Sequence, residues 1–174
     1  MVKILVLVGP HGGGKDYYAD NSVKEDNVKI DFKDKLLELL SIYENLPLTD
    51  KQFYEKWKQH PENRRKLQVF GTEVIRNNIN KNFWVEQCQL KVINAITNNA
   101  DLIINRDTRF PNEYMMWLTF NENIRVEFKF FNYHNLHVGY SHHSSELIAQ
   151  ELIKMGYKHG YIITHSNIKE IIKK

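Results

Sequence analysis

Apolar runs alternate with polar, helix-forming stretches along the chain. Residues 2–8 are Val, Ile and Leu apart from one Lys, and residues 101–105 repeat this pattern in shorter form, as in strands buried on both faces of a parallel sheet. Short strands are also expected at 27–31 and 161–164, and the alternation over 124–131 predicts another. Strands that alternate with helices predict an α/β, three-layer domain with a five-stranded, mostly parallel sheet.

A helix-rich stretch over residues 32–99 interrupts this alternation after the second strand. Thr49 with Gln52 forms a capping-box pattern, and Pro61 suits the first turn of the next helix. Tyr54 and Trp57 are expected to pack inside this stretch. The first helix of this helix-rich stretch is expected to be amphipathic, with an apolar face that it buries. That face contains Phe32, Leu36, Leu39, Leu40 and Tyr43. A helix over 82–98 is expected to bury Trp84, Cys88 and either Val92 or Leu90.

The first apolar run leads directly into a glycine-rich loop, Gly9-Pro-His-Gly-Gly-Gly-Lys15. Its spacing fits G-x-x-x-x-G-K, in which backbone N–H groups and a lysine surround phosphate groups. A helix that begins near Lys15 would add the positive end of its dipole. The alternative is a glycine-rich turn that binds no ligand.

The residue after Lys15 departs from the common pattern. Asp16 stands where Ser or Thr usually contacts Mg²⁺. A carboxylate can ligate magnesium directly or through water, but it adds negative charge beside a triphosphate.

A second polar segment, Arg106-Asp107-Thr108-Arg109, follows the apolar run 101–105. Ligands of parallel sheets lie outside the carboxyl ends of the strands, so this segment and the glycine loop are expected to line one site. Asp107 is a candidate second holder of Mg²⁺ and its waters. It could also cap the helix that starts near Pro111, and the two roles are compatible.

Arginine is scarce, with six residues against eighteen lysines. The planar guanidinium suits bidentate phosphate contacts, so its placement indicates phosphate binding. Five of the six lie in the helix-rich stretch or the second polar segment: Arg64, Arg65, Arg76, Arg106 and Arg109. The alternatives of a solvated helix face for Arg64 and Arg65, and of a simple loop residue for Arg106, stay open.

Composition narrows the class of protein. A chain of 174 residues with net charge +3 suits one domain, residues 1–174, without strong general attraction to nucleic acids or membranes. The single cysteine, Cys88, excludes an internal disulfide and suits a reducing cytosol. The first apolar run is too short to cross a bilayer and lacks a signal-peptide cleavage region, so a cytoplasmic protein is expected.

Several segments together resemble a known family. The matching stretches are Gly14-Lys15-Asp16, residues 65–76, Phe83-Trp84-Val85, residues 107–113, residues 143–146 and residues 161–172. The most specific are the run over 68–84 and Asp-Thr-Arg-Phe-Pro-Asn-Glu at 107–113. In these stretches the chain resembles the bacteriophage-type deoxynucleoside monophosphate kinases, which are adenylate-kinase-like P-loop kinases.

The resemblance implies magnesium-dependent phosphoryl transfer from ATP to a deoxynucleoside monophosphate. Residues 32–99 would form a helical, acceptor-binding insertion of a P-loop NTPase fold, and residues from about 130 to 145 a lid. The catalytic residues would be Lys15, Asp107 and Arg109, and Mg²⁺ would be held by Asp16 and Asp107, directly or through water. ATP would contact Gly9, His11, Gly12, Gly13, Gly14, Lys15, Asp16 and Tyr17. The acceptor would contact Phe32, Lys33, Lys35, Arg65, Gln68, Gly71, Thr72, Arg76, Trp84, Arg109 and Glu113. The lid would contribute Lys129, His143 and Glu146.

The expected partner is therefore a deoxynucleoside monophosphate. Neither a membrane nor a nucleic acid is expected to bind, and a homodimer stays open. A viral protein of this kind would act in the cytoplasm of its host.

Three positions depart from the family pattern. Members often carry Phe-Ala-Asp-Pro-Leu-Lys after the second strand, and in this chain Lys33 or Lys35 would replace the missing lysine. Lys129 stands where an arginine is common, which predicts weaker, monodentate phosphate contacts. His165 stands in place of the usual Asn near the adenine.

A histidine-rich segment precedes the helix expected after Ser144. His142, His143 and Glu146 could ligate a metal, although their spacing matches no zinc pattern. Ser144 or Ser145 as a helix cap accounts for the segment without a metal.

Other functions remain open at this point. A phosphomevalonate kinase-like enzyme would need no aromatic slot for a base. A nucleic-acid end or base kinase would need a basic track, and residues 50–91 contain nine Lys and Arg against five Asp and Glu. A non-catalytic regulator would bind ATP without transfer.

Overall fold

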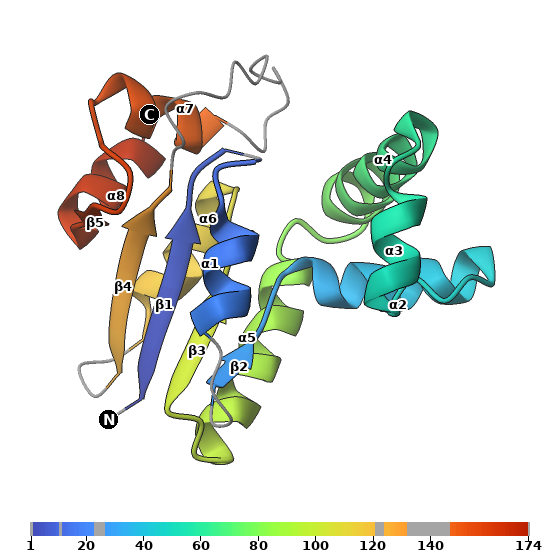
Figure 1. Ribbon diagram of the computed structural model, residues 1–174, viewed down its shortest axis with the longest axis horizontal. Coiled ribbons are helices and arrows are strands. Elements are labelled where there is room, and N and C mark those ends of the chain that lie inside the picture. The colour runs from blue at the N-terminus through green and yellow to red at the C-terminus, as the bar shows by residue number, and fades with distance from the viewer. Residues whose placement is uncertain (1, 11, 23–26, 121–123, 132–146, 174) are drawn as a thin grey trace. The chain divides into compact units, whose positions relative to one another are not determined.

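The computed structural model describes residues 2–10, 12–22, 27–120, 124–131 and 147–173. The chain divides into two compact units. The sheet unit contains Met1–Asp31 and Lys91–Lys174, and the helical unit contains Phe32–Leu90 (Figure 1).

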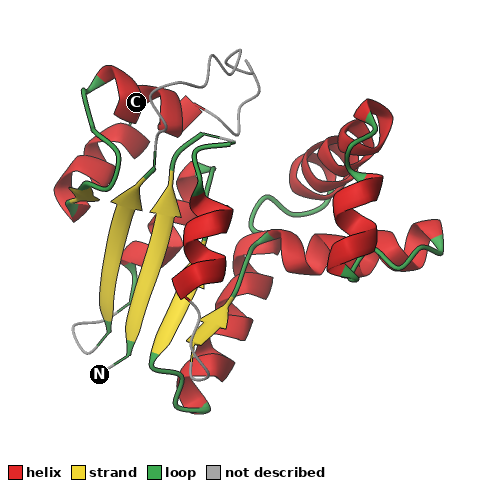
Figure 2. Ribbon diagram, in the orientation of Figure 1, coloured by secondary structure: helices red, strands yellow, loops and turns green. Residues whose placement is uncertain are grey.

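Five strands of the described residues form one sheet in the order β2-β3-β1-β4-β5 (Figure 2). They are β1 (Lys3–Val8), β2 (Asn27–Lys29), β3 (Leu102–Asn105), β4 (Arg125–Phe130) and β5 (Ile162–Ile163). Strand β1 runs parallel to β3 and β4, and β2 runs parallel to β3. Only the two-residue β5 is antiparallel to its neighbour β4 among these pairs. The five-stranded, mostly parallel sheet predicted from the sequence is therefore confirmed.

Helices lie on both faces of this sheet, which gives the α/β architecture (Figure 2). The helices of the sheet unit are α1 (Lys15–Ser22), α6 (Pro111–Leu118), α7 (Leu147–Lys154) and α8 (His165–Ile172). Helix α5 (Phe83–Thr97) begins in the helical unit and ends in the sheet unit.

Strand β1 is buried on both faces, because successive side chains of a strand point to opposite sides. Leu5 and Leu7 pack with Ala19 of α1 on one face. On the other face Tyr114 of α6 stacks on Phe128, with ring centroids 6.1 Å apart. The uninterrupted apolar pattern of residues 2–8 is thus explained by two covered faces.

The helical unit has its own apolar core. Its elements are α2 (Lys33–Glu44), α3 (Lys51–Trp57), α4 (Pro61–Gln68), the π-helix η1 (Val69–Asn77) and the first part of α5. Leu37, Leu40 and Leu48 form the buried centre, and Tyr54 and Trp57 pack against it. The packing role predicted for these two aromatic residues is confirmed.

Some local expectations for the helical unit were wrong. Tyr43 is 75% exposed, because the inward face of α2 is formed by Leu37 and Leu40 and the helix ends at Asn45 in a left-handed conformation. Helix α3 is capped by Asp50, whose carboxylate accepts a hydrogen bond from the Phe53 N–H at 2.7 Å, and not by Thr49.

Helix α5 resolves an alternative that the sequence left open. Val92 is fully buried whereas Leu90 is 62% exposed, and Trp84 and Cys88 are both buried as expected. Within the described part of the chain, no helix is both long enough and apolar enough to cross a membrane.

Candidate functional site

The glycine loop follows β1 at the carboxyl edge of the sheet. Gly9 has a φ of +144°, and a Cβ at this position would lie 2.0 Å from the carbonyl oxygen of Phe131, so only glycine fits. Lys15 is the first residue of α1, and its Nζ donates hydrogen bonds to the carbonyl oxygens of Gly9 and Pro10, both at 2.6 Å. The loop and the helix N-terminus therefore bring backbone N–H groups and an ammonium group together, as anion binding requires.

A buried polar residue, Asn105, holds the turn that follows β3. Its side chain is fully buried and donates hydrogen bonds to the Ile30 carbonyl at 2.9 Å and to Asp107 Oδ1 at 3.1 Å. Its Oδ1 accepts hydrogen bonds from the N–H and the hydroxyl of Thr108, at 3.1 and 2.6 Å. The Thr108 hydroxyl in turn accepts the indole N–H of Trp117 at 2.8 Å. The backbone that carries Asp107 and Arg109 is thus fixed by a closed polar network.

Arg106 joins carboxylates from two other segments. Its Nε lies 2.7 Å from Asp31 Oδ2, and its Nη1 lies 2.9 Å from Asp16 Oδ1 and 3.8 Å from Asp20 Oδ1. Burial lowers the pKa of the Arg106 guanidinium, but the charge and hydrogen bond of Asp31, followed by the charges of Asp16 and Asp107, outweigh that effect and raise the pKa above its usual value. Arg106 is therefore a permanent cation between these carboxylates.

Glu113 holds the backbone on the other side of the turn. Its side chain is 2% exposed, and Oε2 accepts hydrogen bonds from the N–H groups of Arg109 at 2.7 Å and Phe110 at 3.1 Å. The carboxylate thus caps α6 and fixes the start of the Arg109 side chain. A contact of Glu113 or Arg109 with an acceptor stays a prediction.

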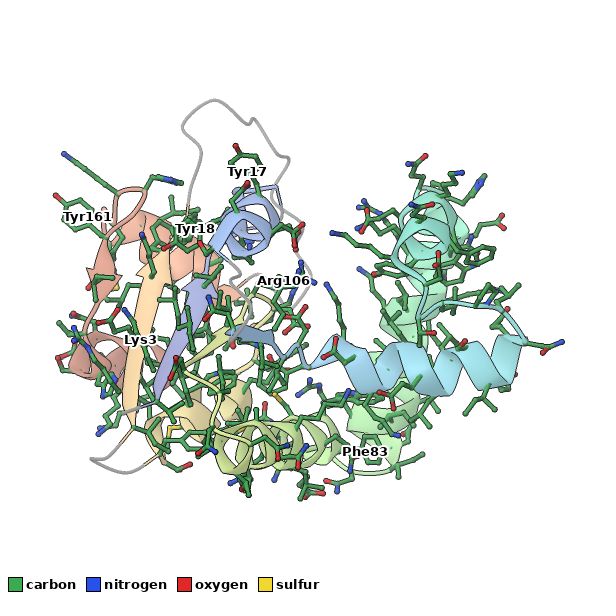
Figure 3. The ribbon with its side chains drawn as sticks, turned by 60° about the horizontal axis from the view of Figure 1, so that its bottom comes forward. Lys3, Tyr17, Tyr18, Phe83, Arg106 and Tyr161 are labelled. Atoms are coloured by element: carbon green, nitrogen blue, oxygen red, sulfur yellow. The ribbon has the colours of Figure 1, made fainter. Side chains whose placement is uncertain are left out.

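Aromatic residues line the face of the sheet beside α1. In Figure 3, Tyr17 points away from the sheet and Tyr18 turns toward it, and Tyr17 is 72% exposed. The Nζ of Lys129 lies 4.5 Å from the centroid of the Tyr18 ring and 5.7 Å from that of Phe131. Lys129 thus packs as a cation on two rings, and its role in a lid stays a prediction.

The helical unit contains most of the residues that are predicted to contact the acceptor. Arg65 and Gln68 of α4 are exposed. In η1, Thr72 is half-buried and Arg76 is 9% exposed, so the burial of these side chains increases from α4 to the end of η1. Trp84 is 3% exposed and donates its indole N–H to the Gly71 carbonyl at 2.8 Å. This contact ties α5 to the π-helix.

The start of α2 supplies the remaining predicted acceptor residues. Phe32 is 5% exposed, Lys33 is half-buried, and Lys35 pairs with Glu38 at 2.8 Å. Whether these residues contact an acceptor stays a prediction.

Three predicted site residues, His11, His143 and Glu146, lie outside the described residues, as do most of the predicted lid and the suggested metal site at His142. Among the residues that are described, no group of three or more His, Cys, Asp or Glu side chains is arranged to hold a metal. His165 Nε2 lies 3.1 Å from the Val126 carbonyl oxygen.

Sequence reasoning did not identify Asn105 or Asp31 as site residues. Both were counted as the last residues of predicted strands. Their polarity at the carboxyl end of a parallel strand is the signal that could have found them, since ligands and their supporting groups gather at that edge.

The described site agrees with a comparison against protein families. Residues 48–125 match the family model of deoxynucleotide monophosphate kinase, a range that contains α3, α4, η1, α5, β3 and α6. The glycine loop lies outside the matched range. A search of curated proteins found no match. The family match confirms the resemblance seen in the sequence, and over these residues it supports a deoxynucleotide monophosphate kinase, a phosphotransferase.

Proposed function

We propose that the protein transfers the γ-phosphoryl group of ATP, in the presence of Mg²⁺, directly to the phosphate of a deoxynucleoside monophosphate. The observation that carries this proposal is the pairing of β1 with β3, which sets the glycine loop beside the turn that bears Asp107 and Arg109. The family match, which covers the turn and most of the helical unit, independently supports a monophosphate acceptor.

In this proposal the loop holds the phosphates of ATP. The backbone N–H groups of Gly12 to Lys15 and the N-terminus of α1 would bind phosphate oxygens. The Lys15 ammonium would exchange its contacts with the Gly9 and Pro10 carbonyls for phosphate oxygens. These contacts neutralise charge where the transferred group and the leaving ADP develop it.

The residues present fit a magnesium ion bound with the nucleotide. Asp16 and Asp107 offer carboxylate oxygens, which are the donors that Mg²⁺ prefers, and the Asp16 side chain is 70% exposed. The described residues form no cage of three metal-binding side chains, so phosphate oxygens and water would complete the coordination. Mg²⁺ would supply additional neutralisation of the phosphate charge.

The reaction then needs alignment more than covalent help from the protein. A phosphate oxygen of the acceptor attacks the γ-phosphorus, the bond to the bridging oxygen breaks, and ADP leaves. Arg109 would stabilise the charge of the group in transfer. Arg65, Gln68, Thr72 and Arg76 would bind the acceptor, with the more buried arginine giving the stronger phosphate contact because less water competes.

The test is ADP release from ATP and Mg²⁺ with a panel of acceptors: dAMP, dGMP, dCMP, dTMP, their ribose forms, phosphomevalonate and a short oligonucleotide. Turnover with at least one deoxynucleoside monophosphate is expected. Arg109→Ala is expected to lower kcat by about 10²-fold or more. The exposed Arg125 at the start of β4 provides the control variant Arg125→Ala, which should leave kcat unchanged.

Bound ATP without turnover of any monophosphate would refute the proposal. Turnover of phosphomevalonate alone, or of the oligonucleotide alone with strong loss of binding in salt, would assign a different acceptor.

A further inference from the structure

Arg106 is placed where three segments of the sheet unit meet. It follows β3, it contacts Asp31 just after β2, and it contacts Asp16 in the first turn of α1. Figure 3 shows Arg106 close to α1. The side chain is 16% exposed, so its contact with the buried Asp31 forms largely out of water.

The two carboxylates have very different surroundings. The Asp31 side chain is 1% exposed and accepts both the Arg106 backbone N–H, at 3.2 Å, and Nε, at 2.7 Å. The Asp16 side chain is 70% exposed and is reached by the other edge of the same guanidinium. One buried ion pair therefore serves as the anchor from which Arg106 reaches Asp16.

Carboxylates outnumber the cations around Arg106. Lys29 lies 2.7 Å from Asp20 Oδ1, so Arg106 and Lys29 face the carboxylates of Asp16, Asp20 and Asp31, and the charge of Asp107 also acts on Arg106. Without Arg106 this cluster would hold one cation against four anions. Such a field beside the glycine loop would oppose a nucleotide polyphosphate.

We propose that Arg106 is a positioning residue, which holds the Asp16 carboxylate at the start of α1 and offsets its charge, so that a nucleotide polyphosphate can bind beside an acidic residue. This inference rests on the proposed function in one respect, since it takes the phosphates of ATP as the ligand of the glycine loop. It accounts for the acidic residue at a position where Ser or Thr is usual. A lysine could not replace Arg106 fully, because one ammonium lacks the two separated N–H edges that reach Asp31 and Asp16 together.

The test is a double-mutant cycle on ATP affinity. Isothermal titration calorimetry measures the Kd for ATP with EDTA, and again with excess Mg²⁺, for the wild type, Arg106→Gln, Asp16→Asn and the double variant. With EDTA, Arg106→Gln is expected to weaken ATP binding about tenfold when Asp16 is present and less than about threefold in the Asp16→Asn background. Excess Mg²⁺ should reduce the larger loss, because the cation neutralises the phosphates.

Two controls separate this role from general stabilisation. Arg106→Gln should lower the melting temperature in both backgrounds, because Asp31 loses its partner in each. Arg106→Lys keeps a cation for Asp31, so it should retain most of the stability and still lose ATP affinity about threefold, with the loss relieved by Asp16→Asn. Arg125→Gln removes an arginine at the amino edge of the sheet and should leave the Kd unchanged.

Equal losses of ATP affinity with Asp16 present and in the Asp16→Asn background would overturn the inference, as would a loss at Arg125→Gln as large as that at Arg106→Gln. If Arg106→Gln does not fold, the same comparison is made with Arg106→Lys. A wild type that binds ATP but phosphorylates no monophosphate would refute only the proposed function, because the cycle measures binding alone. A wild type that binds no ATP would refute both.

Discussion

The fully buried Asn105 provides a sharp test of how the turn after β3 is held. Replacing it with alanine removes four hydrogen bonds, two to the Ile30 carbonyl and Asp107 and two from Thr108. At about 1 kcal/mol for each bond, the loss would be about 4 kcal/mol. Asp107 is half-buried and can bond to water instead, so we expect a decrease of about 3 kcal/mol in the free energy of unfolding.

Thermal unfolding followed by far-UV circular dichroism measures this change. For a chain of this size, about 3 kcal/mol corresponds to a fall of about 6–12 °C in the melting temperature. Trp117 lies in the same network, so its fluorescence should change in the folded variant as well. Activity should also fall, because the turn carries two of the proposed catalytic residues.

Two further variants make the result interpretable. Asn94→Ala, at an exposed position of α5, should change stability by no more than about 0.5 kcal/mol. Asn105→Asp keeps the shape but removes the amide donor and adds a charge beside Asp107, so it should destabilise at pH 7 at least as much as Asn105→Ala. A loss below about 1 kcal/mol in Asn105→Ala would refute the view that this side chain holds the turn.

Three other outcomes are expected. Lys15→Ala should lower kcat by about 10²-fold or more in the ADP-release assay while the variant stays folded, and a fully active variant would refute the proposed mechanism. Gly71→Val should destabilise by about 1–3 kcal/mol in urea unfolding, because a Cβ there already lies 3.2 Å from Leu36 Cδ2, and an unchanged urea midpoint would contradict this packing. The pKa of Glu127 is lowered chiefly by its hydrogen bond from Lys3, so it stabilises the fold above its unfolded pKa of about 4.3 and less as pH falls. The melting temperatures of wild type and Glu127→Gln should therefore converge as the pH falls below that unfolded pKa, and a constant difference would count against this pair.

The sheet could be predicted well because its signal is local. The apolar runs at residues 2–8 and 101–105 reflect strands that are buried on both faces. The alternation before residue 131 reflects a strand with one face more deeply buried than the other, as in β4. The π-helix η1 left no such signal, since its apolar residues also fit an ordinary helix. Tyr43 was wrongly predicted to be buried, because helical spacing alone does not show where the end of a helix extends beyond the core that it packs on.

The candidate site was only partly accessible from the sequence. The place of the glycine loop and of the turn at Asp107 follows from motif and strand order. The pairing of Arg106 with Asp16 and Asp31 could not be predicted in this way. It depends on β3 lying between β2 and β1, and on the Arg106 side chain reaching both the residue after β2 and the helix after β1. A single sequence contains no spacing rule for such a contact.

The two carbonyl contacts of Lys15 bear on which anions the loop can select. The ammonium has oxygen partners within its own loop, the carbonyls of Gly9 and Pro10, so an anion would have to compete with them. A small anion that meets only the ammonium exchanges two hydrogen bonds for about the same number and gains little. A chain of phosphates that also engages the loop amides adds new bonds to that exchange. In the proposed function, this contact of the lysine with its own loop would favour a chain of phosphates over a single small anion, whatever base or sugar the ligand carries.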